Sequence, residues 1–350
     1  MKKITAFLDT SVFFSENFID SRNIKQLLQL AENNEIDLII TDIVYNEILS
    51  KYGESIEIAI PIINNTHTSR NKSARVLRNH DDLVNLFFKP ILDKNDLVNS
   101  FKDKLGTQIK SSHIKIISTQ HLTIQNVMQA YFDRKPPFSE KKKYEFPDAF
   151  SIEGVKEFCI QKKIDNIHIV TKDSDIKFYP EKRFIVSESI SNLLDKYNTQ
   201  KEEMAVTRKH IKELYESNQK YLKTCIEDKF IEYIDNGNFQ NNSYREIINV
   251  APPVITTIEF EDTYNLIELD DRFALIEVYV HIKYEIEYTY HDYTNAYYDD
   301  EDKLWIPLEE AKDTSEDKQY FLAIIKIDHN PPAGSTFGDA KLIDIDLSKI

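Results

Sequence analysis

The sequence predicts an α/β fold in its N-terminal half, then a polar helix and a strand-rich C-terminal part. Three observations support this prediction. Short apolar runs alternate with amphipathic helical segments over about the first 200 residues, the order that builds a parallel sheet through right-handed crossovers. A long polar helical segment covers residues 200–235. From Val254 onward, alternating apolar and polar residues predict antiparallel strands.

The N-terminal elements follow one another in a regular order. Apolar runs predict buried strands at residues 4–8, 37–41, 113–118, 167–170 and 183–187. Apolar residues at helical spacing predict helices over 22–34, after Asp42, over most of 70–108, over 121–133, and from Pro147 or Asp148 onward. Pro147 suits the first position of a helix, and Pro90 is expected to break the charged helical segment that contains it. Strand and helix therefore alternate up to about residue 198.

The chain is expected to have three parts. Residues 1–198 form the α/β domain, residues 199–245 a helical connector, and residues 246–350 an acidic β-rich (α+β) domain. At 350 residues the length suits two or three domains, each large enough to bury a core.

Composition excludes several functional classes. The six glycines form no G-x-G-x-x-G and no P-loop motif, which argues against dinucleotide and P-loop nucleotide binding. Cys159 and Cys225 lie far apart, so neither a disulfide framework nor a thiolate zinc site is expected. No apolar stretch is long enough for a signal peptide or a membrane span, which predicts a cytoplasmic protein without a membrane partner.

The net charge of −15 is concentrated at one end of the chain. Residues 251–350 hold 23 acidic and 8 basic residues, so the rest of the chain is balanced. An acidic surface repels the phosphate backbone of nucleic acids. This repulsion therefore argues against nucleic-acid binding by the C-terminal part but not by the first domain.

Four acidic residues of the first domain lie where a ligand site is expected. Asp9 directly follows the first strand, Glu47 lies in the helix after the second, Asp148 lies at a helix start, and Asp173 follows the strand at 167–170. In an open parallel sheet, ligands bind beyond the carboxyl ends of the strands. We therefore expect these carboxylates to converge on one edge of the sheet.

Carboxylates gathered in this way would repel and raise one another's pKa unless a cation lies between them. Oxygen ligands alone select hard ions such as Mg²⁺ or Mn²⁺, which activate water for attack on a phosphodiester. More ordinary roles compete: a helix or turn cap for Asp9 and Asp148, a solvated helix face for Glu47, and a turn or supporting position for Asp175.

At these residues the sequence resembles the PIN-domain nuclease family. The first strand ends in LDTS at Asp9, Glu47 and Asp148 occupy helices in the expected order, and residues 171–175 read T-x-D-x-D. The stretch PPFSEKKKYEFPDAF is similar to a bacterial PIN-like subgroup described mainly as a domain of unknown function. The resemblance covers about residues 1–195.

The resemblance implies a three-layer α/β/α fold, a Mg²⁺ or Mn²⁺ site, and ribonuclease activity like that of toxin-type PIN proteins, with phage defence as one conceivable role. The implied metal ligands are Asp9, Glu47, Asp148 and Asp173, to which we add Asp175. About 100 residues separate Glu47 from Asp148, more than a compact PIN core needs. A helical insertion near residues 64–112 is therefore expected to modify access of the substrate.

Two further stretches bear on partners. The basic residues leading into Asp148 are expected either to position phosphates or to form a solvated loop. Together with the hydroxyl residues after Asp9 they give the predicted substrate-binding set: Thr10, Ser11, Arg134, Lys141, Lys142 and Lys143. The tyrosine-rich residues 284–298 could stack bases, but the interleaved acids favour a sheet face or a protein-binding surface.

The leading hypothesis is a metal-dependent endonuclease, a hydrolase with RNA favoured over DNA by the resemblance alone. The alternatives are an inactive PIN fold that serves as a binding scaffold, and a nucleotide phosphohydrolase. The acidic C-terminal domain is expected to bind a protein partner or regulate activity, and homo-oligomerisation is left open.

Overall fold

The computed structural model describes residues 3–72, 93–138, 145–177, 179–200, 204–239, 247–300, 304–330 and 340–346. Its contacts divide the chain into two compact units, Met1–Leu193 and Leu194–Ile350. The finer division at residues 198 and 245 stays a proposal. Among the described residues, no helix is long and apolar enough to cross a membrane.

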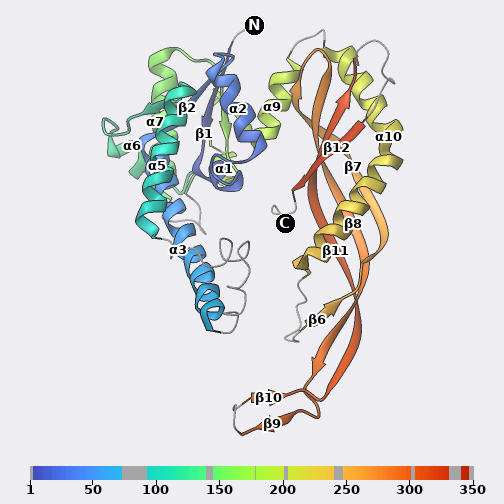
Figure 1. The fold of residues 1–350 in the computed structure, drawn as a ribbon. Coiled ribbons are helices and arrows are strands. Elements are labelled where there is room, and N and C mark those ends of the chain that lie inside the picture. The colour runs from blue at the N-terminus through green and yellow to red at the C-terminus, as the bar shows by residue number, and fades with distance from the viewer. Residues whose placement is uncertain are drawn as a thin grey trace. The chain divides into compact units, whose positions relative to one another are not determined.

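The first unit is built on a five-stranded parallel sheet with helices on both faces (Figure 1). Its strands are β1 (Ile4–Leu8), β2 (Ile36–Thr41), β3 (Lys115–Ile117), β4 (Ile167–Val170) and β5 (Phe184–Ser187). All four pairings are parallel. Every residue of β4, and all but one residue of β1 and of β2, is buried, as strands covered on both faces require. The predicted α/β fold is confirmed.

Helices connect these strands. They are α1 (Thr10–Ser15), α2 (Arg22–Glu32), α3 (Asp42–Lys72), α5 (Lys94–Ser111), α6 (Ile124–Phe132), α7 (Phe146–Lys162), α8 (Ser174–Lys177) and α9 (Ile190–Thr199). Helix α2 has its apolar residues on one buried face, which includes Ile24, Leu27 and Leu28. The insertion predicted near residues 64–112 lies partly outside the described residues, and its described part is helical.

The strand order β3-β2-β1-β4-β5 places the start of the chain in the middle of the sheet. The chain builds outward from β1 to β2 and β3, and then returns to add β4 on the other side of β1. The position between β1 and β4 is therefore the topological switch point, where α/β sheets bind ligands beyond the carboxyl ends of the strands.

The second unit is an antiparallel sheet with the order β12-β11-β8-β6, in which β7 also pairs with β8. Its strands are β6 (Ile247–Val250), β7 (Val254–Leu269), β8 (Phe273–Asp292), β11 (Glu309–Asp328) and β12 (Ala340–Asp346). The C-terminal strand-rich region is therefore confirmed. Alternate residues of β8, such as Val278, Val280 and Ile282, are buried, which gives the sheet one apolar face.

The long helix α10 (Met204–Tyr233) covers this apolar face. Ile211, Leu222 and Phe230 are fully buried and share one core with residues of β8 and β11. The helix that the sequence suggests as a connector thus packs within the C-terminal unit. A short π-helical turn, η2 (Ile234–Asn238), follows it.

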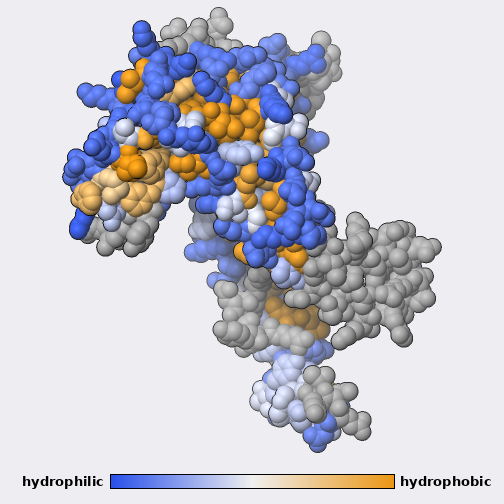
Figure 2. Space-filling view, turned by 90° about the vertical axis from the view of Figure 1, so that its left-hand side faces the viewer, coloured by the Kyte–Doolittle hydropathy of each residue, from blue (hydrophilic) through white to orange (hydrophobic). Residues whose placement is uncertain are grey.

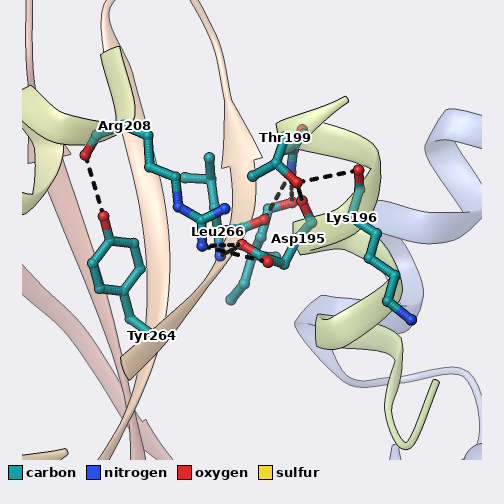
Figure 3. Close-up of polar contacts among 8 residues, drawn as sticks. Asp195, Lys196, Thr199, Arg208, Tyr264 and Leu266 are labelled. Carbon is teal, nitrogen blue, oxygen red and sulfur yellow. Dashed lines mark hydrogen bonds and ion pairs between the residues drawn. The ribbon is translucent and has the colours of Figure 1, made fainter. Parts of the chain in front are cut away.

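Polar contacts tie the end of α9 to β7 within the second unit (Figure 3). The Asp195 carboxylate accepts a hydrogen bond from the Leu266 backbone N–H at 3.0 Å and forms an ion pair with Arg208 at 3.1 Å. Asn198 donates to the backbone carbonyls of Leu266 and Ile267. These contacts fix the entry of the chain into this unit.

Strands β8 and β11 form one long hairpin, paired without interruption from Phe273 and Asp328 to Asp292 and Glu309. Beyond this pairing, the short strands β9 (Tyr297–Asp299) and β10 (Leu304–Ile306) make a separate two-stranded sheet. Figure 1 shows β9 and β10 at the far end of the hairpin, away from α10. We call the described residues 291–300 and 304–310 the hairpin tip.

Candidate metal centre

Backbone hydrogen bonds place two of the predicted acids at the switch point. The Asp9 N–H donates to the Val170 carbonyl, and the Thr171 N–H donates to the Ser187 carbonyl, each at 3.0 Å. These bonds extend the β1–β4 and β4–β5 ladders to their carboxyl ends. Asp9 and the segment that carries Asp173 therefore leave adjacent strands at the same edge of the sheet.

Asp9 is a buried carboxylate, 7% exposed, held by hydroxyl groups from both sides. Its Oδ2 accepts hydrogen bonds from the Ser11 hydroxyl and, at 2.9 Å, from the Thr171 hydroxyl. It also accepts from the Ser11 backbone N–H at 3.4 Å and so caps α1. Because these three donors all use Oδ2, Oδ1 is the oxygen available to a cation. The capping role and a ligand role are thus compatible.

Glu47 is oriented in the same manner. It lies half-buried in α3, and its Oε2 accepts a hydrogen bond from the Thr10 hydroxyl at 2.6 Å. Thr10 and Ser11, predicted as substrate-binding residues, therefore each donate to a carboxylate of the site. Hydroxyl donors of this kind fix the orientation of a ligating carboxylate, as partners around metal sites do.

The start of α7 is positioned by an aromatic cluster and by close packing on the sheet. Phe146 lies 5.1 Å from Phe138 and 5.2 Å from Tyr131 between ring centroids. Farther along α7, the Ser151 and Thr41 hydroxyls are hydrogen-bonded at 3.0 Å. A Cβ at Gly154 would lie 3.2 Å from the Thr119 methyl carbon, so glycine permits the close approach here. The helix that carries Asp148 is therefore fixed relative to β2.

Three carboxylates meet where α7 begins. Carboxylate oxygens of Glu145, Asp148 and Asp173 all lie within 4.8 Å of one another, and all three residues are half-buried. Three oxygen ligands at this spacing suit a hard divalent cation, and no sulfur or imidazole ligand belongs to the group. The residues present therefore fit Mg²⁺ or Mn²⁺.

The electrostatics of Asp148 connect this group to the other two acids. Burial, a hydrogen bond with Glu145, and the charges of Asp9, Glu145 and Glu47 raise the pKa of Asp148 to about 8. Asp9 and Glu47 are thus near enough for their charges to act on Asp148. Carboxylates that repel one another in this way are the arrangement that a bound cation relieves.

Asp42 shows the opposite behaviour at a neighbouring strand end. It directly follows β2, but its carboxylate accepts hydrogen bonds from the Thr119 backbone N–H and hydroxyl, at 3.0 and 2.7 Å. Burial acts to raise its pKa, but the hydrogen bonds from Thr119 prevail and lower it. Asp42 therefore joins β2 to the segment after β3 and needs no cation.

Glu145 was not predicted from the sequence. It lies three residues before Asp148 at the start of α7, a spacing that places two side chains on one face.

The remaining predicted residues have different outcomes. Asp175 lies in α8, and its N–H donates to Asp173 at 2.8 Å. Arg134 lies just after α6. Lys141, Lys142 and Lys143 lie outside the described residues.

The geometry defines a class of protein: an α/β domain with acidic residues gathered beyond the carboxyl ends of a parallel sheet. A family model described as a PIN domain matches residues 6–176, and this part of the chain belongs to the PIN-domain family. The resemblance inferred from the sequence is thus confirmed. PIN domains are in general nucleases that act on nucleic acids and typically use divalent metals. No curated protein and no solved structure matches the chain.

Proposed function

We propose that the N-terminal unit is a metal-dependent endonuclease that hydrolyses phosphodiester bonds, with RNA as the favoured substrate. The observation that carries the proposal is the meeting of Asp148, Asp173 and Glu145 at the topological switch point, with Asp9 and Glu47 close enough to raise the pKa of Asp148. The PIN-domain match to residues 6–176 supports the same reaction class.

Each residue has a proposed role in this reaction. Asp9, Glu47, Asp148 and Asp173 hold the cation, with Glu145 as an additional ligand and Asp175 as a supporting residue. A bound Mg²⁺ or Mn²⁺ would polarise the scissile phosphate and activate water. Ser11 and Thr171 keep Asp9 in its orientation, and Thr10 does the same for Glu47. The residues thus provide an anionic, rigid pocket that selects a hard cation.

The substrate preference rests on different grounds. RNA rather than DNA is favoured by likeness to toxin-type PIN proteins, and Arg134 with Lys141, Lys142 and Lys143 is proposed to position the phosphates. The acidic C-terminal unit would repel a nucleic-acid backbone only within about 8 Å at physiological ionic strength. Acidic and basic residues balance over residues 1–250, so the excess negative charge does not argue against a nucleic-acid substrate for the N-terminal unit.

The proposal is tested by cleavage of an end-labelled 20-nucleotide RNA by the full chain with Mn²⁺, with Mg²⁺, or with EDTA. The same-sequence DNA and free ATP serve as parallel substrates. Asp9→Asn and Asp148→Asn should each lower the cleavage rate roughly 100-fold or more, because each removes a charged ligand. Asp103→Asn is the matched control, since it removes one exposed carboxylate of α5 and should leave the rate unchanged.

The outcomes separate the competing functions. Cleavage in EDTA, or wild-type turnover by Asp148→Asn at saturating Mn²⁺, would overturn the proposal. Binding of RNA without cleavage under either metal would favour a scaffold function. Hydrolysis of ATP with intact RNA would favour a nucleotide phosphohydrolase.

A further inference from the structure

The tyrosine-rich residues 284–298 divide into two groups with opposite environments. Tyr284 and Tyr288 belong to β8 and are 2% and 4% exposed, with their hydroxyls directed to Asp317 and Asp313 at 3.4 Å. They belong to the sheet of the second unit. Tyr297 and Tyr298, by contrast, lie in β9 at the hairpin tip and are 58% and 40% exposed. The tip therefore presents aromatic side chains that the core does not use.

The hairpin tip gathers most of its apolar side chains on the surface. Among the residues that the structure describes there, six large apolar ones are exposed: Tyr293, Tyr297, Tyr298, Trp305, Ile306 and Leu308. Trp305 is the one tryptophan of the chain and is 61% exposed. Figure 2 shows the end of the hairpin at the bottom of the view, where pale surface of intermediate hydropathy lies beside blue hydrophilic surface.

The pairing of β9 with β10 puts apolar side chains on both faces of the tip. Trp305 is opposite Tyr298, with ring centroids 5.1 Å apart, and Ile306 is opposite Tyr297. Because side chains alternate along a strand, the two pairs point to opposite faces. A two-stranded sheet is only marginally stable by itself. Covering one of these faces with a partner would therefore bury apolar area and order the tip.

Charge decides which class of partner fits. Residues 291–310 contain seven acidic residues and one lysine. This charge repels the phosphates of nucleic acids and the anionic surface of membranes. A second copy would bring an equally acidic tip if the two tips met. Exposed aromatic residues with charged neighbours in the chain match the anatomy of protein interfaces, in which aromatic anchors supply most of the binding energy and polar residues lie around them.

We propose that the hairpin tip is a docking surface for a basic protein, with Trp305 and Tyr298 as the aromatic anchor and the exposed acids Asp300, Glu309 and Glu310 as the groups that select Lys and Arg. The proposal concerns the C-terminal unit and does not depend on the nuclease assignment. It specifies both the place and the chemistry of the contact, namely an apolar centre flanked by positive charges on the partner.

The full chain provides its own reporter, because its tryptophan emission arises from Trp305 alone. The probes are two labelled 16-residue peptides, four repeats of Arg-Leu-Lys-Ser and four repeats of Arg-Gly-Lys-Ser, which carry the same charge. The leucine peptide should bind about tenfold tighter or better and shift the emission to shorter wavelength. In the Trp305→Ser variant, the affinity for the leucine peptide should fall to that for the glycine peptide. Tyr320→Ser, a half-exposed residue of β11 outside the tip, is the matched control.

Three results would overturn the proposal. Equal affinity for the two peptides, unaffected by Trp305→Ser, would show that acidic charge alone attracts them. An emission shift with a 20-nucleotide oligouridylate or with phosphatidylglycerol vesicles would identify a nucleic-acid or membrane surface instead. A shift on concentrating the protein alone, with a rise in molecular mass, would identify a self-association surface.

Discussion

The two units of this chain place acidic residues in opposite environments. In the first unit, Asp9, Asp148 and Asp173 lie buried or half-buried at one edge of a parallel sheet, with other carboxylates as neighbours. In the second unit, acids such as Asp313 and Asp317 lie on antiparallel strands beside tyrosine hydroxyls. The same residue type therefore forms a candidate cation site in one unit and an acidic surface in the other.

The difference teaches that topology, rather than acidity, predicts a metal site. Parallel strands bring their carboxyl ends to a single edge, so acids distant in the sequence meet there. Antiparallel strands have no common carboxyl end, so their acids are spread along the length of the strands, as at Asp313 and Asp317. The C-terminal part holds the whole excess negative charge of the chain, yet the carboxylate cluster found among the described residues lies in the N-terminal unit.

The largest expected difference between the two regions is in stabilisation by metal. Mn²⁺ at 100 times its dissociation constant should raise the free energy of unfolding by about 2.7 kcal/mol. Asp9→Asn and Asp173→Asn should abolish most of this increase, whereas Asp313→Asn and Asp317→Asn should preserve it. Urea unfolding with and without Mn²⁺ measures the effect. If Asp313→Asn or Asp317→Asn also lost the stabilisation by Mn²⁺, the two regions would not differ in metal binding.

The next largest effect concerns pH. Asp148 in the folded protein retains its proton up to about pH 8, whereas in the unfolded chain it loses the proton near pH 3.8. Between these values the unfolded state binds fewer protons, so the metal-free protein should lose stability as pH rises, by at most about 1.4 kcal/mol per pH unit. The difference in unfolding free energy between wild type and Asp148→Asn isolates this slope. A flat difference from pH 5 to pH 8 would contradict the repulsion among the acids.

Glu145 sharpens the comparison within the site. Its hydrogen bond and its charge both raise the pKa of Asp148, so Glu145→Gln should move the midpoint of the pH effect to lower pH. The variant should also weaken Mn²⁺ binding about tenfold if Glu145 supports the cation. Calorimetric titration at pH 9, where Asp148 is ionised, measures the affinity. Unchanged affinity with a shifted midpoint would show that Glu145 acts on Asp148 alone.

The smallest expected effect is that of the hydroxyls around Asp9. Thr171→Val removes the hydrogen bond to Oδ2 of Asp9 and the one that the Thr171 hydroxyl accepts from the Asp173 backbone N–H at 3.0 Å, but keeps the shape of the side chain. A loss of about 1 kcal/mol or slightly more, roughly fivefold in Mn²⁺ affinity, is expected from these neutral hydrogen bonds. Thr107→Val, in which the lost hydroxyl bonds only to a helix carbonyl of α5, is the control. An equal loss in both variants would remove the orienting role from Thr171.

Much of the fold could be predicted because each N-terminal strand is a short apolar run between helical segments. That Asp9 and Asp173 leave the sheet at the same edge followed from the rules of parallel sheets, whereas the strand order β3-β2-β1-β4-β5 was not predicted and comes from the structure. Helix α1 was missed because its six residues, TSVFFS, are too few to show a helical period. The packing of α10 on the C-terminal sheet was missed because its apolar residues are interrupted by many charges.

The candidate site was predictable to a similar extent. Position after a strand singles out Asp9 and Asp173 as candidates, but Asp42 also follows a strand and is bound by Thr119 instead. The part played by Glu145 depends on how α7 enters the structure. The tyrosines of residues 284–298 show a feature that the sequence alone could not predict, namely which of them are buried. Tyr284 and Tyr298 look alike in the sequence, and only strand pairing shows that one is core and the other lies at the hairpin tip.

The central claim is that the carboxylates at the switch point hold one shared cation. Crystals of the full chain soaked in Mn²⁺ and measured at the manganese absorption edge test it most directly. We predict an anomalous peak within about 2.5 Å of carboxylate oxygens of Asp9, Asp148 and Asp173, the range for oxygen ligands of divalent cations. A peak elsewhere, or none at saturating Mn²⁺, would contradict the account.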